Sequence, residues 1–374
     1  MNPLKMLKEH GQVVWLDFLS RGFIVRGDLK RLIDQDGLCG VTSNPSIFEK
    51  AIDNSDDYDG EIRLRLLQPN CSVEQLYEGL AIQDIKHAAD VLRPVYDATE
   101  GADGYVSLEV SPYLAMQTEP TIAEARRLWD EVDRENLMIK VPATQAGLGA
   151  IRVLTADGIN VNITLLFAQE VYERVVDAFM SGLEELAAAG GNVAKVASVA
   201  SLFVSRIDTL IDKEIDQIAA KTSAPNEKAR LAALKGKVAI SNAKLTYQRH
   251  KHLFGGGRWE KLTGKGARPQ RLLWASTGTK NKAYSDVLYV EELIGPNTIN
   301  TMPPATLEAF RDHGKVRDTL EAGLADAEAV LNDLARAGIS LQQVTDELTK
   351  DGVRLFAKAA DKLLDALGKK RTAL

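Results

Sequence analysis

The sequence predicts an α/β protein folded as a closed (β/α)8 barrel with additional helices, notably at the C-terminus. Eight short apolar runs recur along the 374 residues, and longer stretches with helical periodicity separate most of them. Such alternation indicates a parallel sheet, and eight units in a chain of this length favour a closed barrel over an open sheet. No Gly-x-Gly-x-x-Gly or P-loop pattern follows any run, which argues against a nucleotide-binding sheet.

The predicted strands are residues 13–17, 40–44, 105–110, 137–142, 159–164, 193–200, 271–276 and 297–301. Recognisable helix ends lie between them. Ser72 and Gln75 have the spacing of a capping box at the start of a long helix, and Thr121 with Glu124 predicts the start of the next. The segment 168–189 has the pattern of an amphipathic helix, which two glycines end.

Composition limits the classes of partner and the compartment. Hydrophobic residues make up 45% and charged residues 26% of the chain, as expected for a globular protein with a substantial core. A net charge of −6 argues against nucleic acid as a partner. Residues 1–10 are too polar for a signal peptide, and no apolar run is long enough for a membrane. Cys39 and Cys71 form no metal or disulfide pattern, so we expect a cytoplasmic protein.

We expect residues 1–374 to form one barrel domain with two additions. The segment 221–271 holds thirteen Lys or Arg against two Glu, and we expect a solvated helix ending near Phe254 followed by a mobile loop. A role for a minority of these charges in concentrating an anionic substrate stays open. The extension 305–374 carries helical Leu and Ala stripes, and we expect it to pack around the barrel without chemistry of its own.

Lys140 lies alone in the apolar segment 136–142. Burial disfavours a charged amine, and a neutral amine is a nucleophile that can form a Schiff base with a ketone. The alternative is a lysine at a strand end whose ammonium reaches water along its aliphatic stem. Other predicted strands that end in reactive or anion-binding groups favour the catalytic interpretation.

In a (β/α)8 barrel, side chains at the carboxyl ends of the strands meet in the active site. The residues expected to meet there are Asp17, Asn44, Glu109, Lys140, Asn162, Thr164, Ser201 and Ser276. An amine with carboxylates, amides and hydroxyls fits amine catalysis on a carbonyl compound. As alternatives, Asp17 could cap the following turn and Asn44 before Pro45 fits turn chemistry. Thr164 and Asn162 also suit structural roles at strand ends and caps. A buried carboxylate such as Glu109 is costly without a function or a partner.

Metal catalysis is the main chemical alternative, and the histidines argue against it. The five histidines are scattered, none lies at a predicted strand end, and His250 with His252 fits a helix surface. They also form no evident nucleophile–histidine pair. We therefore expect neither a metal nor an organic cofactor.

The sequence resembles the transaldolases, the Schiff-base aldolases of the pentose phosphate pathway, in six motifs that occur in the order typical of that family. They are residues 15–17, 42–46, 108–111, 139–144, 162–167 and 201–207, with a looser match through Ser276. The resemblance implies a barrel with the nucleophilic lysine on the fourth strand. It also implies ketose phosphates such as sedoheptulose 7-phosphate or fructose 6-phosphate as donors.

The resemblance also implies roles for individual residues. Lys140 would attack the keto carbon, and Glu109 would act through a water in carbinolamine formation and dehydration, with help from Thr164. Asp17 would take the proton of the C4 hydroxyl, which breaks the C3–C4 bond. The substrate-binding residues would be Asn44, Asn162, Ser201, Phe203, Arg206, Ser276 and Lys280.

One position departs from the family pattern. Many transaldolases have an aromatic residue and a phosphate-binding arginine after the segment matching Ser276, whereas this chain has Lys280 in a shifted position. A lysine lacks the bidentate fork of arginine. Arg206 is expected to hold a phosphate. The alternative is a surface helix arginine that pairs with Asp208 or another nearby acid. The expected assembly is a monomer or a homodimer, and the alternative functions are an aldolase releasing free dihydroxyacetone and a non-catalytic sugar-phosphate-binding barrel.

Overall fold

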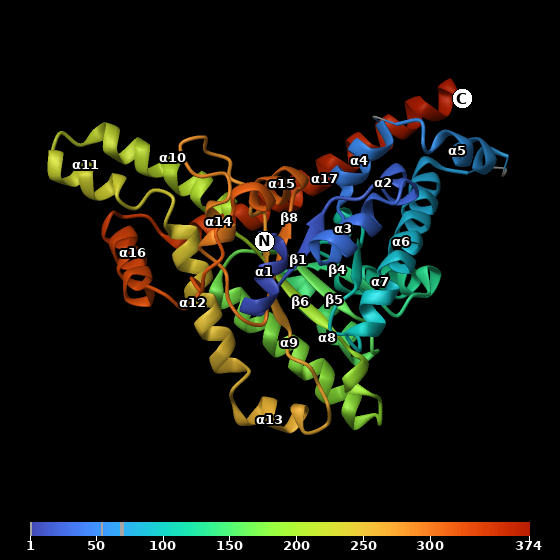
Figure 1. The fold of residues 1–374 in the computed structure, drawn as a ribbon, viewed down its shortest axis with the longest axis horizontal. Coiled ribbons are helices and arrows are strands. Elements are labelled where there is room, and N and C mark those ends of the chain that lie inside the picture. Colours follow the sequence, from blue (N-terminus) through green and yellow to red (C-terminus); the bar gives the residue numbers. More distant parts are fainter. Residues whose placement is uncertain (1, 54, 68–70) are drawn as a thin grey trace.

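The computed structural model describes residues 2–53, 55–67 and 71–374, so Met1, residue 54 and residues 68–70 of the predicted domain lie outside the described part. Eight parallel strands form a closed barrel in chain order, and the last strand pairs with the first (Figure 1). The strands are β1 Gln12–Asp17, β2 Leu38–Thr42, β3 Tyr105–Glu109, β4 Leu137–Pro142, β5 Val161–Leu166, β6 Ser198–Phe203, β7 Arg271–Ala275 and β8 Thr298–Met302. The predicted (β/α)8 barrel is confirmed.

Three strand predictions were displaced along the chain. β2 ends at Thr42 and not at Asn44, so Asn44 lies in the turn that leads into α4 (Pro45–Asp53). β6 begins at Ser198 and not at residue 193, because Val193–Lys195 forms a 3-10 helix with Asn192 as its N-cap. β5 extends to Leu166 across an irregularity in its pairing with β6, where Leu165 has φ 53°.

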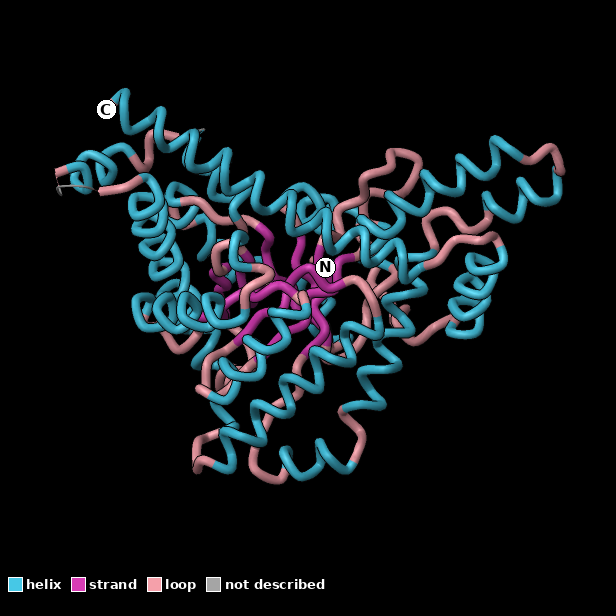
Figure 2. The backbone as a smooth tube through the Cα atoms, turned by 180° about the vertical axis from the view of Figure 1, so that it is seen from behind, coloured by secondary structure: helices cyan, strands magenta, loops and turns pink. Residues whose placement is uncertain are grey.

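Helices surround the strands (Figure 2). Those of the ring include α3 Asp28–Asp36, α6 Val73–Ala98, α7 Thr118–Val132, α8 Gln145–Ala156, α9 Gln169–Ala188, α10 Ser205–Lys221 and α15 Pro304–His313. The capping box at Ser72 is confirmed, with bonds in both directions to Gln75. The predicted helix start at Thr121 was wrong. The Thr121 hydroxyl donates to the Leu114 carbonyl, and α7 begins one turn earlier, after Gln117.

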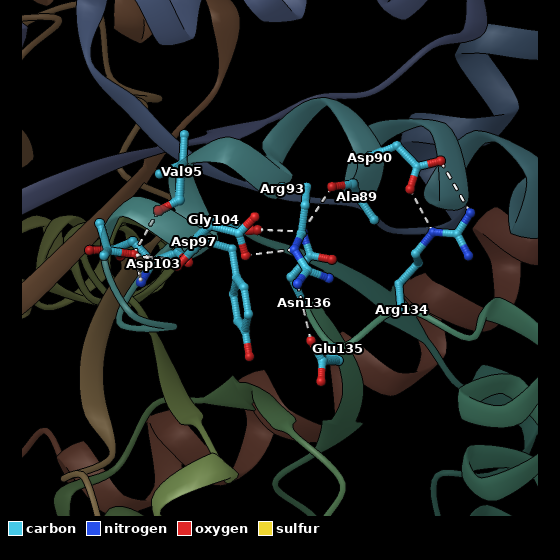
Figure 3. A network of polar contacts seen from close by, with 12 residues as sticks. Ala89, Asp90, Arg93, Val95, Asp97, Asp103, Gly104, Arg134, Glu135 and Asn136 are labelled. Carbon is cyan, nitrogen blue, oxygen red and sulfur yellow. Dashed lines mark hydrogen bonds and ion pairs between the residues drawn. The ribbon is translucent and has the colours of Figure 1, made fainter.

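A polar network fixes the first residues of β4 against α6 (Figure 3). The Asn136 amide donates to the Ala89 and Gly104 carbonyls, at 2.9 and 2.8 Å. Arg134 reaches Asp90 on α6 through its guanidinium. The position of Lys140, four residues beyond Asn136, is therefore set by bonds at the opposite end of its strand.

The basic segment forms α11 (Pro225–Ala232), α12 (Val238–Leu253) and α13 (Gly257–Thr263). The predicted helix end near Phe254 is confirmed, but the expectation of a solvated helix was wrong, because most of α12 is buried. The expected loop contains α13. Many of the charges pair with acids on neighbouring helices, as Arg258 does with Asp177 and Glu184. His250 is buried and bonded to the Tyr172 hydroxyl, so its predicted place on a helix surface was wrong.

The C-terminal extension contains α16 (Leu324–Arg336) and the long α17 (Leu341–Ala373). α17 runs across the end of the barrel beside α4, and the two helices are in contact (Figure 1). Lys370 fastens its last turns through a bond to the Ile52 carbonyl and an ion pair with Asp59. In the described part of the chain, no helix is long and apolar enough to cross a membrane.

Candidate active site

A cavity of about 490 Å³ opens at the carboxyl ends of the strands. Of the eleven predicted site residues, nine line this central cavity: Asp17, Asn44, Lys140, Thr164, Ser201, Phe203, Arg206, Ser276 and Lys280. Glu109 and Asn162 stand beside it, paired in register with Lys140 from the two neighbouring strands. The structure therefore brings the whole predicted set into one region.

Lys140 is the centre of this region. The residue is only 5% exposed, so its ammonium does not reach water along the stem, and the alternative interpretation was wrong. Its Nζ donates to the Ser43 carbonyl at 2.9 Å and lies 3.8 Å from Glu109 Oε2. These two contacts hold the amine at the cavity wall beside a carboxyl group, where an entering carbonyl carbon can meet it.

The Asp17 carboxyl ends β1 on the opposite wall. Thr42 donates its hydroxyl to Asp17 Oδ1 at 2.8 Å and shares a second 2.8 Å bond with Thr301. Burial raises the pKa of Asp17, and the positive charge of Lys140 is the largest opposing influence. A carboxyl that is buried, oriented by a hydroxyl and close to a cation can take and return a proton.

Glu109 ends β3, with a side chain only 6% exposed. Burial, opposed by the charge of Lys140 and helped by the charge of Asp17, raises the pKa of Glu109 to about 7. Among the described residues, neither Glu109 Oε2 nor Thr164 Oγ1 has a hydrogen-bond partner. Two buried, unpartnered polar atoms near the amine suit a water molecule or a substrate oxygen.

The amides of Asn162 and Asn44 are partly engaged by the protein. Asn162 donates to the Ser107 hydroxyl at 2.9 Å and accepts from Ser201 at 2.7 Å. Asn44 Oδ1 accepts from the Ile47 amide at 3.1 Å, so the cap interpretation holds for that oxygen. Asn162 orients Ser201, which lines the cavity, and substrate contacts of either amide stay predictions.

Arg206 and Lys280 supply positive charge at the wall formed by β6 and β7. Arg206 is the second residue of α10, and its guanidinium carbon lies 5.2 Å from the centre of the Phe203 ring. Burial lowers the pKa of Arg206, although Asp17 opposes this. In the described chain Arg206 forms no ion pair within 4.0 Å, while Asp208 accepts from Ala239 and Tyr289. The alternative pairing of Arg206 with Asp208 was therefore wrong.

The backbone near Ser276 has an unusual conformation. Ser276 has φ 56°, in the left-handed region, and its hydroxyl lies 3.0 Å from that of Ser205 at the start of α10. A non-glycine residue in that region is held there by its surroundings. The loop after β7 is thus tied to the first turn of α10, which carries Arg206.

Sequence reasoning missed two groups of cavity residues. Thr301 lies at a predicted strand end, and that position could have revealed it. Leu355, Phe356 and Ala359 of α17 also line the cavity, although the C-terminal extension was expected to carry no part of the site. No local pattern in a helical segment shows which distant barrel end it covers. No described residue of the basic segment lines the cavity, so its charges do not form the site wall.

A closed barrel with a buried lysine between carboxyl groups defines an enzyme class that acts on its substrate at the strand ends. Residues 14–367 match the family described as transaldolase/fructose-6-phosphate aldolase, and the chain belongs to this family. It is similar to the transaldolase of Thermobifida fusca, 48% identical over 100% of this chain and 99% of the relative. It is also similar to the transaldolase of Parafrankia sp. (49%; 98% and 97%) and to transaldolase 2 of Nostoc sp. PCC 7120 (46%; 98% and 97%).

Proposed function

We propose that this enzyme transfers a dihydroxyacetone unit from a ketose phosphate to an aldose phosphate through a Schiff base on Lys140. The observation that carries the proposal is the buried amine 3.8 Å from Glu109, inside a cavity that also holds Asp17 and Arg206. Similarity to transaldolases over the full chain supports the reaction. The donors proposed are sedoheptulose 7-phosphate and fructose 6-phosphate, as in the pentose phosphate pathway.

The first half-reaction joins the donor to the enzyme. The Lys140 amine adds to the keto carbon, and one N–H proton passes to the keto oxygen to give a carbinolamine. The carbinolamine hydroxyl then leaves as water with a proton from Glu109. A carboxyl with a pKa of about 7 can give and recover this proton near neutral pH. The product is an iminium whose positive charge lies near both carboxyl groups, which favours their ionised forms.

The second half-reaction cuts and remakes a carbon–carbon bond. Ionised Asp17 takes the C4 hydroxyl proton, the C3–C4 electron pair moves toward the iminium, and an aldose phosphate leaves. The dihydroxyacetone unit stays on Lys140 as an enamine. The enamine carbon then attacks the aldehyde of an acceptor aldose phosphate, and Asp17 returns its proton to the new C4 hydroxyl oxygen. Hydrolysis of the resulting iminium frees the new ketose phosphate.

The phosphate of the sugar would lie against Arg206, with Lys280 and the hydroxyls of Ser201 and Ser276 as further contacts. The guanidinium gives charge-assisted bonds to a dianion, and Lys280 gives a point charge without a fixed fork. Asn44 and Asn162 would contact or orient the groups that hold the dihydroxyacetone hydroxyls.

Transfer and simple aldol cleavage share all these steps up to the enamine. We therefore propose incubation with fructose 6-phosphate, with and without erythrose 4-phosphate, while free dihydroxyacetone and sedoheptulose 7-phosphate are measured. Acceptor-dependent formation of the seven-carbon product with little free dihydroxyacetone is expected. Release of dihydroxyacetone at the same rate with and without acceptor would indicate an aldolase, and no turnover would indicate a binding protein.

The remaining parts of the proposal concern the setting of the enzyme. We propose small sugar phosphates as its partners, with neither nucleic acid nor membrane, because the chain carries a net charge of −6. We propose a cytoplasmic monomer or homodimer, and sedimentation together with cell fractionation tests this directly.

A further inference from the structure

A second cavity lies behind the wall that carries Glu109. It has a volume of about 160 Å³ and lies between the end of β3, α6, α7 and α17, with the exposed Tyr113 at its rim. Its polar lining includes Tyr77, Glu78, Glu109, Ser111 and Glu124. No residue lines both this side cavity and the central cavity, so the two are separate spaces on either side of one wall.

Glu109 is the residue that connects the two spaces. It lines the side cavity, while its Oε2 lies 3.8 Å from the Lys140 amine, which lines the central one. Its charge also acts on the other side, because the pKa of Tyr77 is raised by burial and then by Glu109. Glu109 therefore lies in the wall between the Lys140 amine and the side cavity, which Tyr77 also lines.

The side cavity has both the room and the polar groups that water needs. A water molecule requires about 15 Å³ of cavity and two to four polar partners, so a cavity of about 160 Å³ has room for several. Glu109 lines this cavity, and its Oε2, which lies 3.8 Å from Lys140 Nζ, has no hydrogen-bond partner among the described residues. Glu124, whose carboxylate accepts from the Ser111 amide at 3.1 Å, provides a second fixed polar group.

The proposed chemistry needs a place for water that the substrate does not occupy. Formation of the iminium breaks the carbinolamine C–O bond and releases one water. Hydrolysis of the product iminium consumes one. At both moments a sugar phosphate fills the central cavity in front of Lys140, so water must move on another side.

We propose that the side cavity behind Glu109 is the water chamber of the reaction, with Tyr77 as a positioning residue for that water. This inference rests on the proposed Schiff-base function. In the forward step Glu109 gives its proton to the carbinolamine hydroxyl, and the water formed leaves past the carboxyl into the chamber. In the reverse step a chamber water adds to the iminium carbon, and its proton passes to the Glu109 carboxylate.

Two neighbouring residues of α17 provide a matched pair of variants. Ala359 lines the central cavity and Ala360 lines the side cavity, so the same substitution on one helix fills one space or the other. The measurement is loss of ¹⁸O from the C2 carbonyl of labelled fructose 6-phosphate into water, followed by mass spectrometry. This exchange needs the imine to form and hydrolyse, but it needs no carbon–carbon cleavage.

Ala360→Leu should slow ¹⁸O loss and the rate of borohydride trapping by about tenfold, because it displaces ordered water, with KM nearly unchanged. Ala359→Leu, in the substrate cavity, should raise KM for fructose 6-phosphate by a larger factor than it lowers ¹⁸O loss at saturating ketose. If folded Ala360→Leu lost ¹⁸O at the wild-type rate, the proposed water chamber would be wrong. The same conclusion would follow if Ala359→Leu slowed ¹⁸O loss as much as Ala360→Leu does.

Tyr77→Phe provides a second variant that preserves packing. The ring keeps its edge-to-face contact with Phe48, in which the two ring centres lie 5.8 Å apart. Removal of one hydroxyl should slow ¹⁸O loss roughly fivefold and leave the KM for ketose unchanged. An unchanged exchange rate in Tyr77→Phe would exclude its positioning role. Failure of the proposed function is distinct, because the wild-type enzyme would then show no borohydride-trapped adduct at all.

Discussion

The Lys140 amine and the Glu109 carboxyl face each other because their strands pair in register, and burial gives the carboxyl its chemistry. Its pKa of about 7 exceeds the ordinary value of 4.5, so the neutral form persists to neutral pH. The sequence identified both residues from single polar positions in apolar strands. It could not give the 3.8 Å separation, because strand register depends on the whole barrel.

The raised pKa of Glu109 predicts a pH dependence with a definite sign. The neutral acid donates the proton that expels water, so the rate of imine formation should fall as pH rises through about 7. Borohydride trapping rates measured at several pH values test this. Glu109→Gln should be slow and lack the transition, and a transition that persists in this variant would assign it to another group.

Asp17 is predicted to act after the imine has formed. Asp17→Asn keeps an oxygen that can accept the 2.8 Å bond from Thr42 but cannot take a proton. We expect normal borohydride trapping with fructose 6-phosphate and a loss of cleavage of about 10²–10⁴-fold. The rate of glyceraldehyde 3-phosphate release measures cleavage, and release at the wild-type rate would remove Asp17 from this role.

Arg206 is predicted to bind the phosphate and not to support the fold. Charge-assisted bonds contribute about 1.5–3 kcal/mol each, so Arg206→Ala should raise KM for phosphorylated donors about tenfold to a hundredfold. Unphosphorylated fructose should be affected little. Lys280→Ala serves as the comparison and should show a weaker effect of the same kind, whereas equal losses for both sugars in Arg206→Ala would contradict phosphate recognition.

At the scale of elements, α17 connects the C-terminal extension to the catalytic strands. Gly352 packs on Leu165, which follows Thr164 and has φ 53°. A Cβ at Gly352 would lie 2.7 Å from Leu165 Cδ2, so a larger residue there requires the buried Leu165 side chain to shift. The sequence predicted helices here from Leu and Ala spacing, but their place over the barrel depends on contacts between residues nearly two hundred positions apart.

Gly352→Ala should therefore destabilise the protein by about 1–3 kcal/mol, because Leu165 must move. Gly368 lies on the same helix with open space around its Cα, and it provides the control. Gly368→Ala should stabilise by up to about 1 kcal/mol through helix propensity. Urea unfolding of both variants measures the difference, and equal effects would show that the contact with Leu165 is unimportant.

At the scale of the whole molecule, alternating strand and helix patterns predicted the barrel and six ordered motifs predicted its family. Boundaries failed where local chemistry competed, as in the 3-10 helix Val193–Lys195 before β6. The ion pairs of the basic segment could not be predicted either, because their acidic residues lie on segments distant in the sequence. Arg249, for example, pairs with Glu173 on α9. The largest feature that the sequence-based prediction lacked is the lining of the central cavity by α17.

The whole reaction is predicted to need no metal, because the iminium itself accepts the electron pair of the broken bond. Activity should be unchanged after exhaustive treatment with a chelator and removal of the chelated ions. The assay is transfer from fructose 6-phosphate to erythrose 4-phosphate before and after treatment. Loss of activity that a divalent ion restores would refute this prediction.

The most direct test of the central claim is the site of covalent attachment. The enzyme is incubated with fructose 6-phosphate and borohydride, digested, and its peptides are mapped by mass spectrometry. Lys50 and Lys280 line the same cavity as Lys140 and provide internal controls for selectivity. We predict one reduced adduct, on Lys140. The Lys140→Arg variant should show neither this adduct nor turnover. An adduct on Lys50 or Lys280, or turnover in Lys140→Arg, would contradict the account.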